Sequence, residues 1–139
     1  PDSAPGYCGR AQLVQNLSAV TAACMLVRKD TWDAVGGFDE QYAVAFNDVD
    51  FCLRVRERGL RNVWTTYAKA IHHESKSRGS ENTLPKWLRF RGEMARLKAR
   101  WGNALLEDPA YNPNLTLDAK NVSLAWPPRV RKPWVARER

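Results

Sequence analysis

The chain has 139 residues, of which 44% are hydrophobic and 27% are charged, as expected for one globular domain with a modest core. Its longest apolar run, residues 17–27, is too short to cross a bilayer. Its three cysteines match no zinc or redox spacing and cannot all pair with one another, which favours a reducing cytoplasm. Because the chain begins at Pro1, we expect it to be a piece of a longer protein.

The net charge of +7 divides the chain into two parts. Residues 1–83 hold 10 basic and 10 acidic residues, whereas residues 84–139 hold 12 basic and 5 acidic residues and carry the whole excess. This asymmetry predicts that the second part faces nucleic acid, a phospholipid surface or a phosphorylated substrate. The alternative is a solvated basic helix and tail.

The first part begins with a loop, and residues 17–27 are so continuously apolar that they predict a strand buried on both faces. Asp30 can cap a short helix over residues 31–35, which Gly36 and Gly37 would end. A loop over residues 38–46 would follow.

Asn47 is a good N-cap, and Asp50 stands three residues later at the capping-box position. The helix that begins there should end near Arg58, with Gly59 just beyond it. Its pattern places Phe51, Cys52 and Val55 inward and Arg54, Glu57 and Arg58 more outward. Residues 62–67 and 68–72 read as short strands or as one bent strand.

Residues 84–106 predict the longest helix, with Thr83 as its cap and Pro85 in its first turn. Large apolar side chains recur along it at steps of three and four residues and form one stripe, from Trp87 to Leu105. The proline-rich segment beyond Glu107 predicts an irregular tail. Helices alternating with few strands indicate an α/β fold that is only part of a domain.

The pair Asp48 and Asp50 is the strongest candidate for chemistry. A hydroxyl is a poor nucleophile until its proton is leaving, so a transfer to a hydroxyl needs a base. The first turn of a helix holds a carboxylate rigidly, and the positive helix end favours the ionised form. Two residues apart, the carboxylates point in different directions, so Asp48 is the candidate base and Asp50 the cap. The alternative is that both only stabilise the start of the helix.

Two further candidates follow residue 71. In an extended segment His72 and Glu74 share one face and His73 the other, and imidazole with carboxylate suits a divalent cation such as Mn²⁺. Ser77 and Arg78 can hold phosphate oxygens. The alternative is an ordinary polar surface, because two ligands on one strand do not make a metal site.

Four blocks together resemble the C-terminal half of bacterial family-2 glycosyltransferases with the GT-A fold. They are residues 19–24, 36–40, 47–50 and 72–79, whose order and spacing both match. The later residues 108–109 and 111–115 resemble a tail found in O-antigen and cell-surface polysaccharide transferases. The resemblance divides the chain into an acceptor and catalytic-base half, residues 1–83, and a basic amphipathic helix with a proline-rich tail, residues 84–139.

The resemblance implies an inverting transfer of a sugar from a nucleotide-sugar donor to a hydroxyl of a glycan or lipid-linked acceptor. Asp48 would be the general base, and a divalent metal, Mn²⁺ or Mg²⁺, would be held with help from His72 or His73. The roles implied for the other site residues are the acceptor side (Gly37, Phe38, Asp39, Asn47) and the diphosphate (Ser77, Arg78). The family's nucleotide-binding strands and its Asp-x-Asp motif would precede this region, so we expect residues 1–139 alone to be inactive.

The remaining partners are also expectations. The missing N-terminal half of the same domain is one, and a homodimer formed through the surface that this half would cover is another. Nucleic acid is disfavoured, because the aromatic residues of segment 84–106 fall on its apolar stripe and are better explained as core. We expect a cytoplasmic protein, with the inner face of the membrane as the alternative location. An inactive homologue that acts only in assembly stays open.

Overall fold

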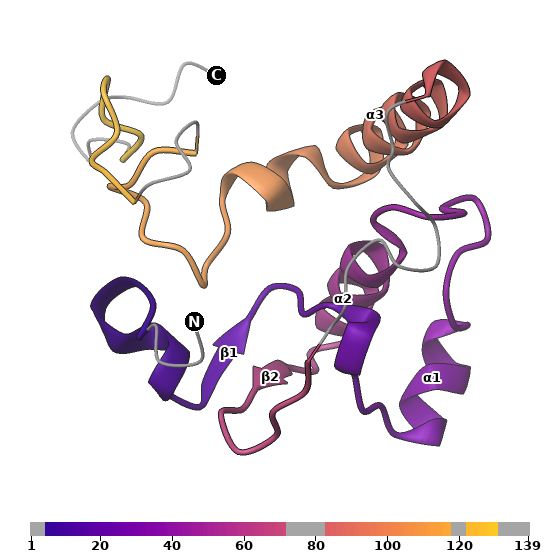
Figure 1. The fold of residues 1–139 in the computed structure, drawn as a ribbon, viewed down its shortest axis with the longest axis horizontal. Coiled ribbons are helices and arrows are strands. Elements are labelled where there is room, and N and C mark those ends of the chain that lie inside the picture. The colour runs from indigo at the N-terminus through magenta and orange to yellow at the C-terminus, as the bar shows by residue number, and fades with distance from the viewer. Residues whose placement is uncertain (1–4, 72–82, 118–121, 131–139) are drawn as a thin grey trace.

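The computed structural model describes residues 5–71, 83–117 and 122–130. Three helices and a two-stranded sheet make up the regular structure of these residues, together with two short 3-10 helices (Figure 1). The helices are α1 (Lys29–Val35), α2 (Asn47–Glu57) and α3 (Leu84–Leu106); the strands are β1 (Gln15–Leu17) and β2 (Asn62–Trp64); and the 3-10 helices span Tyr7–Gln12 and Ala22–Cys24. Helices with a small sheet confirm the predicted α/β class at this coarse level.

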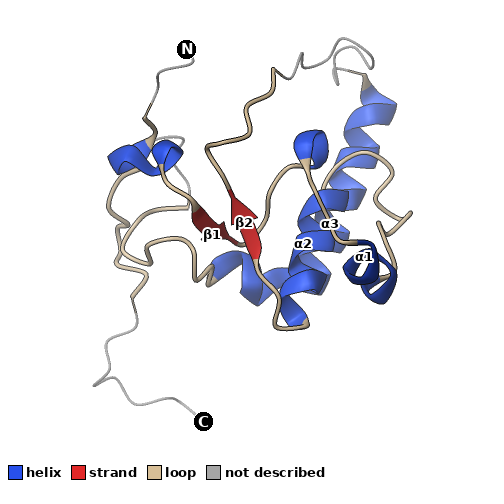
Figure 2. Ribbon diagram, turned by 90° about the horizontal axis from the view of Figure 1, so that it is seen from below, coloured by secondary structure: helices blue, strands red, loops and turns tan. Residues whose placement is uncertain are grey.

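The sheet is antiparallel, with Gln15 opposite Trp64 and Leu17 opposite Asn62 (Figure 2). The side-chain amide of Asn62 donates to the carbonyls of Ser18 and Cys52, both at 3.0 Å. This amide therefore ties the end of the sheet to helix α2. The sheet thus lies against the helix that carries the candidate base.

The predicted strand over residues 17–27 is wrong. Only Leu17 belongs to a strand; Ala22–Cys24 form a 3-10 turn, and Leu26 is fully exposed. The Thr21 hydroxyl accepts the Ala23 N–H at 3.2 Å and so starts the turn. An apolar run becomes a buried strand only if strands lie on both sides of it, and in the described residues β1 has one neighbour.

The strands predicted over residues 62–67 and 68–72 are largely wrong as well. Strand β2 ends at Trp64, and residues 68–71 have no regular structure. The Thr65 hydroxyl accepts the Tyr67 N–H at 3.3 Å, a local hydrogen bond that competes with pairing to another strand. Residue 72 lies outside the described ranges.

Helix α1 begins two residues before the predicted start and ends as predicted. Arg28 occupies the N-cap position, so Asp30 lies in the first turn, where its carboxylate accepts the Thr31 N–H at 2.6 Å. Gly36 and Gly37 both have positive φ and both donate their N–H to the Trp32 carbonyl, at 2.9 and 3.0 Å. The glycine pair therefore ends the helix and turns the chain toward α2.

Substitution of the two glycines by alanine should reduce the free energy of unfolding by different amounts. A Cβ on Gly37 would lie 2.9 Å from Cζ2 of Trp32, whereas a Cβ on Gly36 would meet nothing within 4 Å. We expect Gly36→Ala to cost about 1 kcal/mol, the strain of a left-handed alanine, and Gly37→Ala about 1–3 kcal/mol more. Urea denaturation of the two variants measures this difference, and equal costs would contradict the close approach of Trp32.

Helix α2 confirms the predicted inward residues, because Phe51, Cys52 and Val55 are all buried. Its N-cap is Phe46, in the left-handed conformation with φ of 67°, and Asn47 is the first helical residue. Arg58 is the C-cap and Gly59 follows with φ of 75°, as predicted. The outward placement of Arg54 is wrong, since its side chain is only 12% exposed and is bound to a buried carboxylate.

Helix α3 has the predicted bounds, Leu84–Leu106, and begins with Thr83 and Pro85 as expected. The second half of its apolar stripe is core, because Leu97 and Trp101 pack with Tyr42 and Leu53. The first half is not, and Trp87 remains 48% exposed. In Figure 1 the first turns of α3 extend beyond the rest of the structure at the upper right.

The segment after α3 is irregular, as predicted, yet it is anchored. An isolated antiparallel bridge joins Leu115 and Leu124, and Leu115 and Ala125 are buried. The Arg129 guanidinium donates to the Leu115 carbonyl at 2.6 Å. Among the described helices, none has both the length and the apolar character required to cross a bilayer.

Candidate active site

Asp48 lies in the first turn of α2 with its side chain partly exposed. One carboxylate oxygen accepts the Val49 N–H at 2.8 Å, and the other accepts the Ala22 N–H at 3.1 Å. The second donor belongs to the short 3-10 helix, so the carboxylate is held between two segments that are 26 residues apart. Two donors fix its direction and leave lone pairs open to solvent. The arrangement presents a carboxylate at the start of α2 that is fixed in direction and still accessible.

Asp50 does not cap the helix. Its own N–H makes a regular helical bond to the Phe46 carbonyl, and its side chain is completely buried. One carboxylate oxygen accepts from Nε of Arg54 at 2.7 Å; the other accepts from the indole N–H of Trp101 at 2.8 Å and lies 3.2 Å from the Arg100 guanidinium. Because its partners come from both helices, the Asp50 carboxylate ties α2 to α3.

Arg54 extends this network to the glycine turn. Its guanidinium donates to the carbonyls of Val35 and Gly37 at 2.8 and 2.7 Å while it also binds Asp50. The two motifs that the sequence placed side by side are therefore joined by one side chain.

The acceptor-side candidates lie close to this network, but each is occupied by protein contacts. The Phe38 ring packs on Trp32 and Phe51, with ring centroids 5.0 and 5.5 Å away. Asp39 accepts the Gln41 N–H at 2.9 Å and lies 3.4 Å from Arg100. The side-chain oxygen of Asn47 accepts the Asp48 N–H at 2.8 Å. Gly37 is buried against Trp32, so all four residues have a role in the fold, and contact with an acceptor stays a prediction.

Side chains of α3 contact the loop that precedes Asp48 and hold it in place. The Glu93 carboxylate, only 4% exposed, accepts the Ala45 N–H at 2.7 Å, and the ring of Phe90 packs on Phe46 at 5.3 Å. Sequence reasoning missed Glu93. The available signal was that it is the single acid among six basic residues in α3, which is unusual for a purely solvated face.

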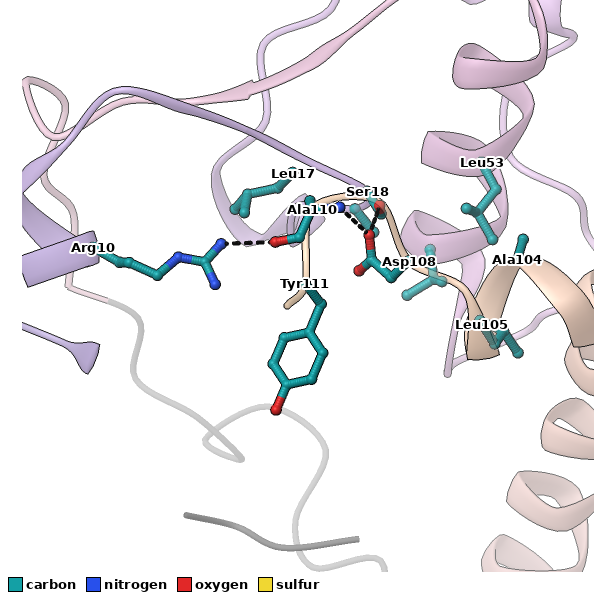
Figure 3. A pocket seen from close by; sticks show the side chains of 11 residues that line it. Arg10, Leu17, Ser18, Leu53, Ala104, Leu105, Asp108, Ala110 and Tyr111 are labelled. Atoms are coloured by element: carbon teal, nitrogen blue, oxygen red, sulfur yellow. Dashed lines mark hydrogen bonds between the residues drawn. The ribbon is translucent and has the colours of Figure 1, made fainter. Parts of the chain in front are cut away.

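A cavity of about 340 Å³ is lined by Val49 and Leu53 of α2 together with residues from the first part of the chain, the end of α3 and the segment after it (Figure 3). Polar side chains from the two ends of the chain meet there: the Ser18 hydroxyl donates to Asp108, and the Arg10 guanidinium donates to the Ala110 carbonyl at 3.2 Å. Its full lining is mixed in polarity (Arg10, Leu17, Ser18, Ala19, Val49, Leu53, Ala104, Leu105, Asp108, Ala110, Tyr111). The tail motif at residues 108–115 therefore packs against the first part of the chain.

Cys52 behaves as a buried apolar residue, as its position in the helix predicted. Its sulfur contacts the backbone of Val20, 3.5 Å from the nitrogen and 3.7 Å from the oxygen. Burial raises the pKa of the thiol, so the protonated form is favoured and Cys52 is no candidate nucleophile.

The other predicted site residues, His72, His73, Ser77 and Arg78, lie outside the described residues. Within residues 5–71, 83–117 and 122–130, no three side chains of His, Cys, Asp or Glu come together as a metal site.

Comparison with known proteins adds three relatives. No model of a protein family matches the chain, and no solved structure matches it. An uncharacterized protein of Sinorhizobium fredii is 49% identical over 91% of this chain and 14% of its own length. An O-antigen biosynthesis protein of Myxococcus xanthus is 36% identical over 84% of this chain and 9% of its own length. An N-acetylglucosaminyl-diphospho-decaprenol L-rhamnosyltransferase of Mycobacterium tuberculosis is 36% identical over 45% of this chain and 20% of its own length.

The chain thus spans only 9% to 20% of the length of these relatives. Two of their names concern O-antigen synthesis and sugar transfer, so the chain is glycosyltransferase-like in sequence, and the predicted resemblance is confirmed at that level. The family-2 assignment and the partial GT-A fold stay predictions.

Proposed function

We propose that this chain is the acceptor and base side of a glycosyltransferase of cell-surface polysaccharide synthesis. The reaction would move a sugar from a nucleotide-sugar donor to a hydroxyl of a glycan or lipid-linked acceptor, with inversion at the anomeric carbon. Similarity to an O-antigen biosynthesis protein and to a rhamnosyltransferase supports the reaction class.

One observation carries the assignment of roles within the chain. Of the two carboxylates in the motif at residues 47–50, Asp50 is completely buried in an ion-pair network, whereas Asp48 is partly exposed and held by two N–H donors. Of these two carboxylates, Asp48 is therefore the one accessible from solvent, which supports its assignment as the base. In the proposed reaction it accepts the proton of the acceptor hydroxyl while that oxygen attacks the anomeric carbon and the nucleoside diphosphate leaves.

The donor and metal contacts of the proposed site lie outside the described residues. Donor binding would come from a nucleotide-binding segment of the longer protein, and the metal and diphosphate contacts from His72 or His73 and from Ser77 and Arg78. The metal would neutralise charge on the leaving diphosphate. We therefore expect residues 1–139 alone to show no transfer, whereas the full-length protein is active when a divalent cation is present.

Turnover of the full-length protein with nucleotide sugars tests the reaction class. A panel of uridine-, guanosine- and thymidine-diphosphate sugars, each with Mn²⁺ or Mg²⁺, should include one donor from which the nucleoside diphosphate is released faster when acceptor is added. The anomeric configuration of the product, read by nuclear magnetic resonance, should be opposite to that of the donor. Release from no donor, or retention of configuration, would contradict the proposal.

A further inference from the structure

The exposed side of helix α3 carries an unusual set of side chains. Leu84, Trp87, Leu88, Arg91 and Lys98, here called the α3 outer stripe, recur at steps of three, four and seven residues and so share one face of the helix. Leu84 and Leu88 lie on a different side of the helix from Leu97 and Trp101, whereas Trp87, about four turns before Trp101, lies near the border between the two sides. Its three large apolar side chains are 68%, 48% and 55% exposed, in chain order. The Arg91 guanidinium lies 4.7 Å from the centre of the Trp87 ring.

The charges of α3 are nearly all positive. The helix carries six basic residues and one acid, Glu93, which is buried. Arg96 and Arg100 are directed back into the protein, where Arg96 donates to the Gln41 carbonyl at 2.7 Å and Arg100 pairs with Asp39 and Asp50. Arg91 is exposed beside Trp87, and Lys98 is exposed about two turns further along the helix, at the edge of a cavity that Leu53 of α2 also lines.

We propose that the α3 outer stripe docks the protein on an anionic lipid surface. Leucine and tryptophan that enter the boundary between headgroups and acyl chains, beside cations that meet anionic headgroups, are the features of a helix that lies in a membrane interface. In Figure 1 the first turns of α3 lie at the upper right of the structure, away from the sheet and from α1.

Two other occupants fit less well. A second copy would bring two sets of cations together with no exposed acid in α3 to compensate them. Single-stranded nucleic acid would need ring faces on which bases stack, but Leu84 and Leu88 offer none, and Arg91 already covers the ring of Trp87. The charge and the aliphatic side chains together favour lipid. This surface is separate from Asp48, so the inference stands apart from the proposed transferase activity.

Vesicle flotation of the full-length protein tests the proposal. We expect the protein to float with vesicles of phosphatidylcholine and phosphatidylglycerol mixed 7:3, and not with phosphatidylcholine alone. The double variant Leu88→Ser/Arg91→Glu should lower the ratio of bound to free protein on the order of tenfold, because it removes an apolar contact and reverses a charge. Circular dichroism checks that the variant is folded.

The chain offers a matched control. Leu13→Ser/Lys69→Glu removes a leucine of nearly equal exposure, 57% against 55%, and reverses one exposed lysine that lies outside α3. It should float like the unaltered protein. The proposal is overturned if the two double variants float equally, if the unaltered protein stays with neither kind of vesicle, or if neutral vesicles bind it as well. Loss of a dimer or of oligonucleotide binding in Leu88→Ser/Arg91→Glu, without loss of vesicle binding, would also overturn it.

Discussion

Asp50→Ala should destabilise the protein by about 3–5 kcal/mol, the usual cost of removing one partner of a buried ion pair. The Asp50 side chain is completely buried, and its loss leaves the largely buried guanidinium of Arg54 without a carboxylate and the indole N–H of Trp101 without an acceptor. Helices α2 and α3 and the glycine turn would lose the buried carboxylate whose network joins them. For a domain of this size the melting temperature should fall by roughly 10 °C or more.

An exposed ion pair in α1 gives the matched control for Asp50→Ala. Asp33 also pairs with a basic residue four positions away on the same helix, Lys29 at 2.6 Å, but the two side chains are 55% and 84% exposed. Asp33→Ala should therefore cost less than about 0.5 kcal/mol. Calorimetry or urea denaturation compares the two variants. If Asp50→Ala were as mild as Asp33→Ala, the buried network would not hold α2 against α3.

The bounds of α3 could be predicted from the sequence because three independent signals agree there. The apolar side chains keep a helical period, Thr83 and Pro85 are typical of a helix start, and the proline-rich segment that follows cannot continue a helix. The glycine pair that ends α1 was predictable for a similar reason. Each of these features depends only on residues close together in the sequence, and tertiary packing does not change it.

Residues 17–27 show why an apolar run by itself does not predict a buried strand. A run of this kind is compatible with a buried strand, but whether it becomes one depends on neighbouring strands supplied by distant parts of the chain. The described residues supply only β2, and the Thr21 hydroxyl starts a 3-10 turn instead. Sequence pattern carries no information about the missing neighbour.

The candidate site was only half predictable. The different directions of Asp48 and Asp50 followed from helical geometry and are confirmed, but the burial of Asp50 was missed. The signal for it was Arg54 four residues later, the spacing of an ion pair on one helix face. The partners from α3, Trp101 and Glu93, could not be predicted, because which turn of α3 meets α2 depends on tertiary packing.

Asp48→Asn should lower the rate of sugar transfer by about 10²–10⁴-fold, which is the contribution usual for general acid–base catalysis. An amide keeps the shape of the side chain, and its single carbonyl oxygen can still accept the N–H of Ala22 or that of Val49, which now bind separate carboxylate oxygens. It cannot take a proton from a hydroxyl. Because the side chain is only partly buried, we expect the free energy of unfolding to change by less than about 1 kcal/mol. The loss would be in kcat more than in KM.

Asp30 provides a matched control, since it too lies in the first turn of a helix and accepts the N–H of the next residue, at 2.6 Å. The central claim is that the proton acceptor of the reaction is the Asp48 carboxylate. The most direct measurement is the transfer rate of the full-length protein at saturating donor and acceptor, for Asp48→Asn and Asp30→Asn side by side. We expect a fall of at least 10²-fold in the first variant and less than about twofold in the second; a folded Asp48→Asn protein that transfers as fast as Asp30→Asn would contradict the claim.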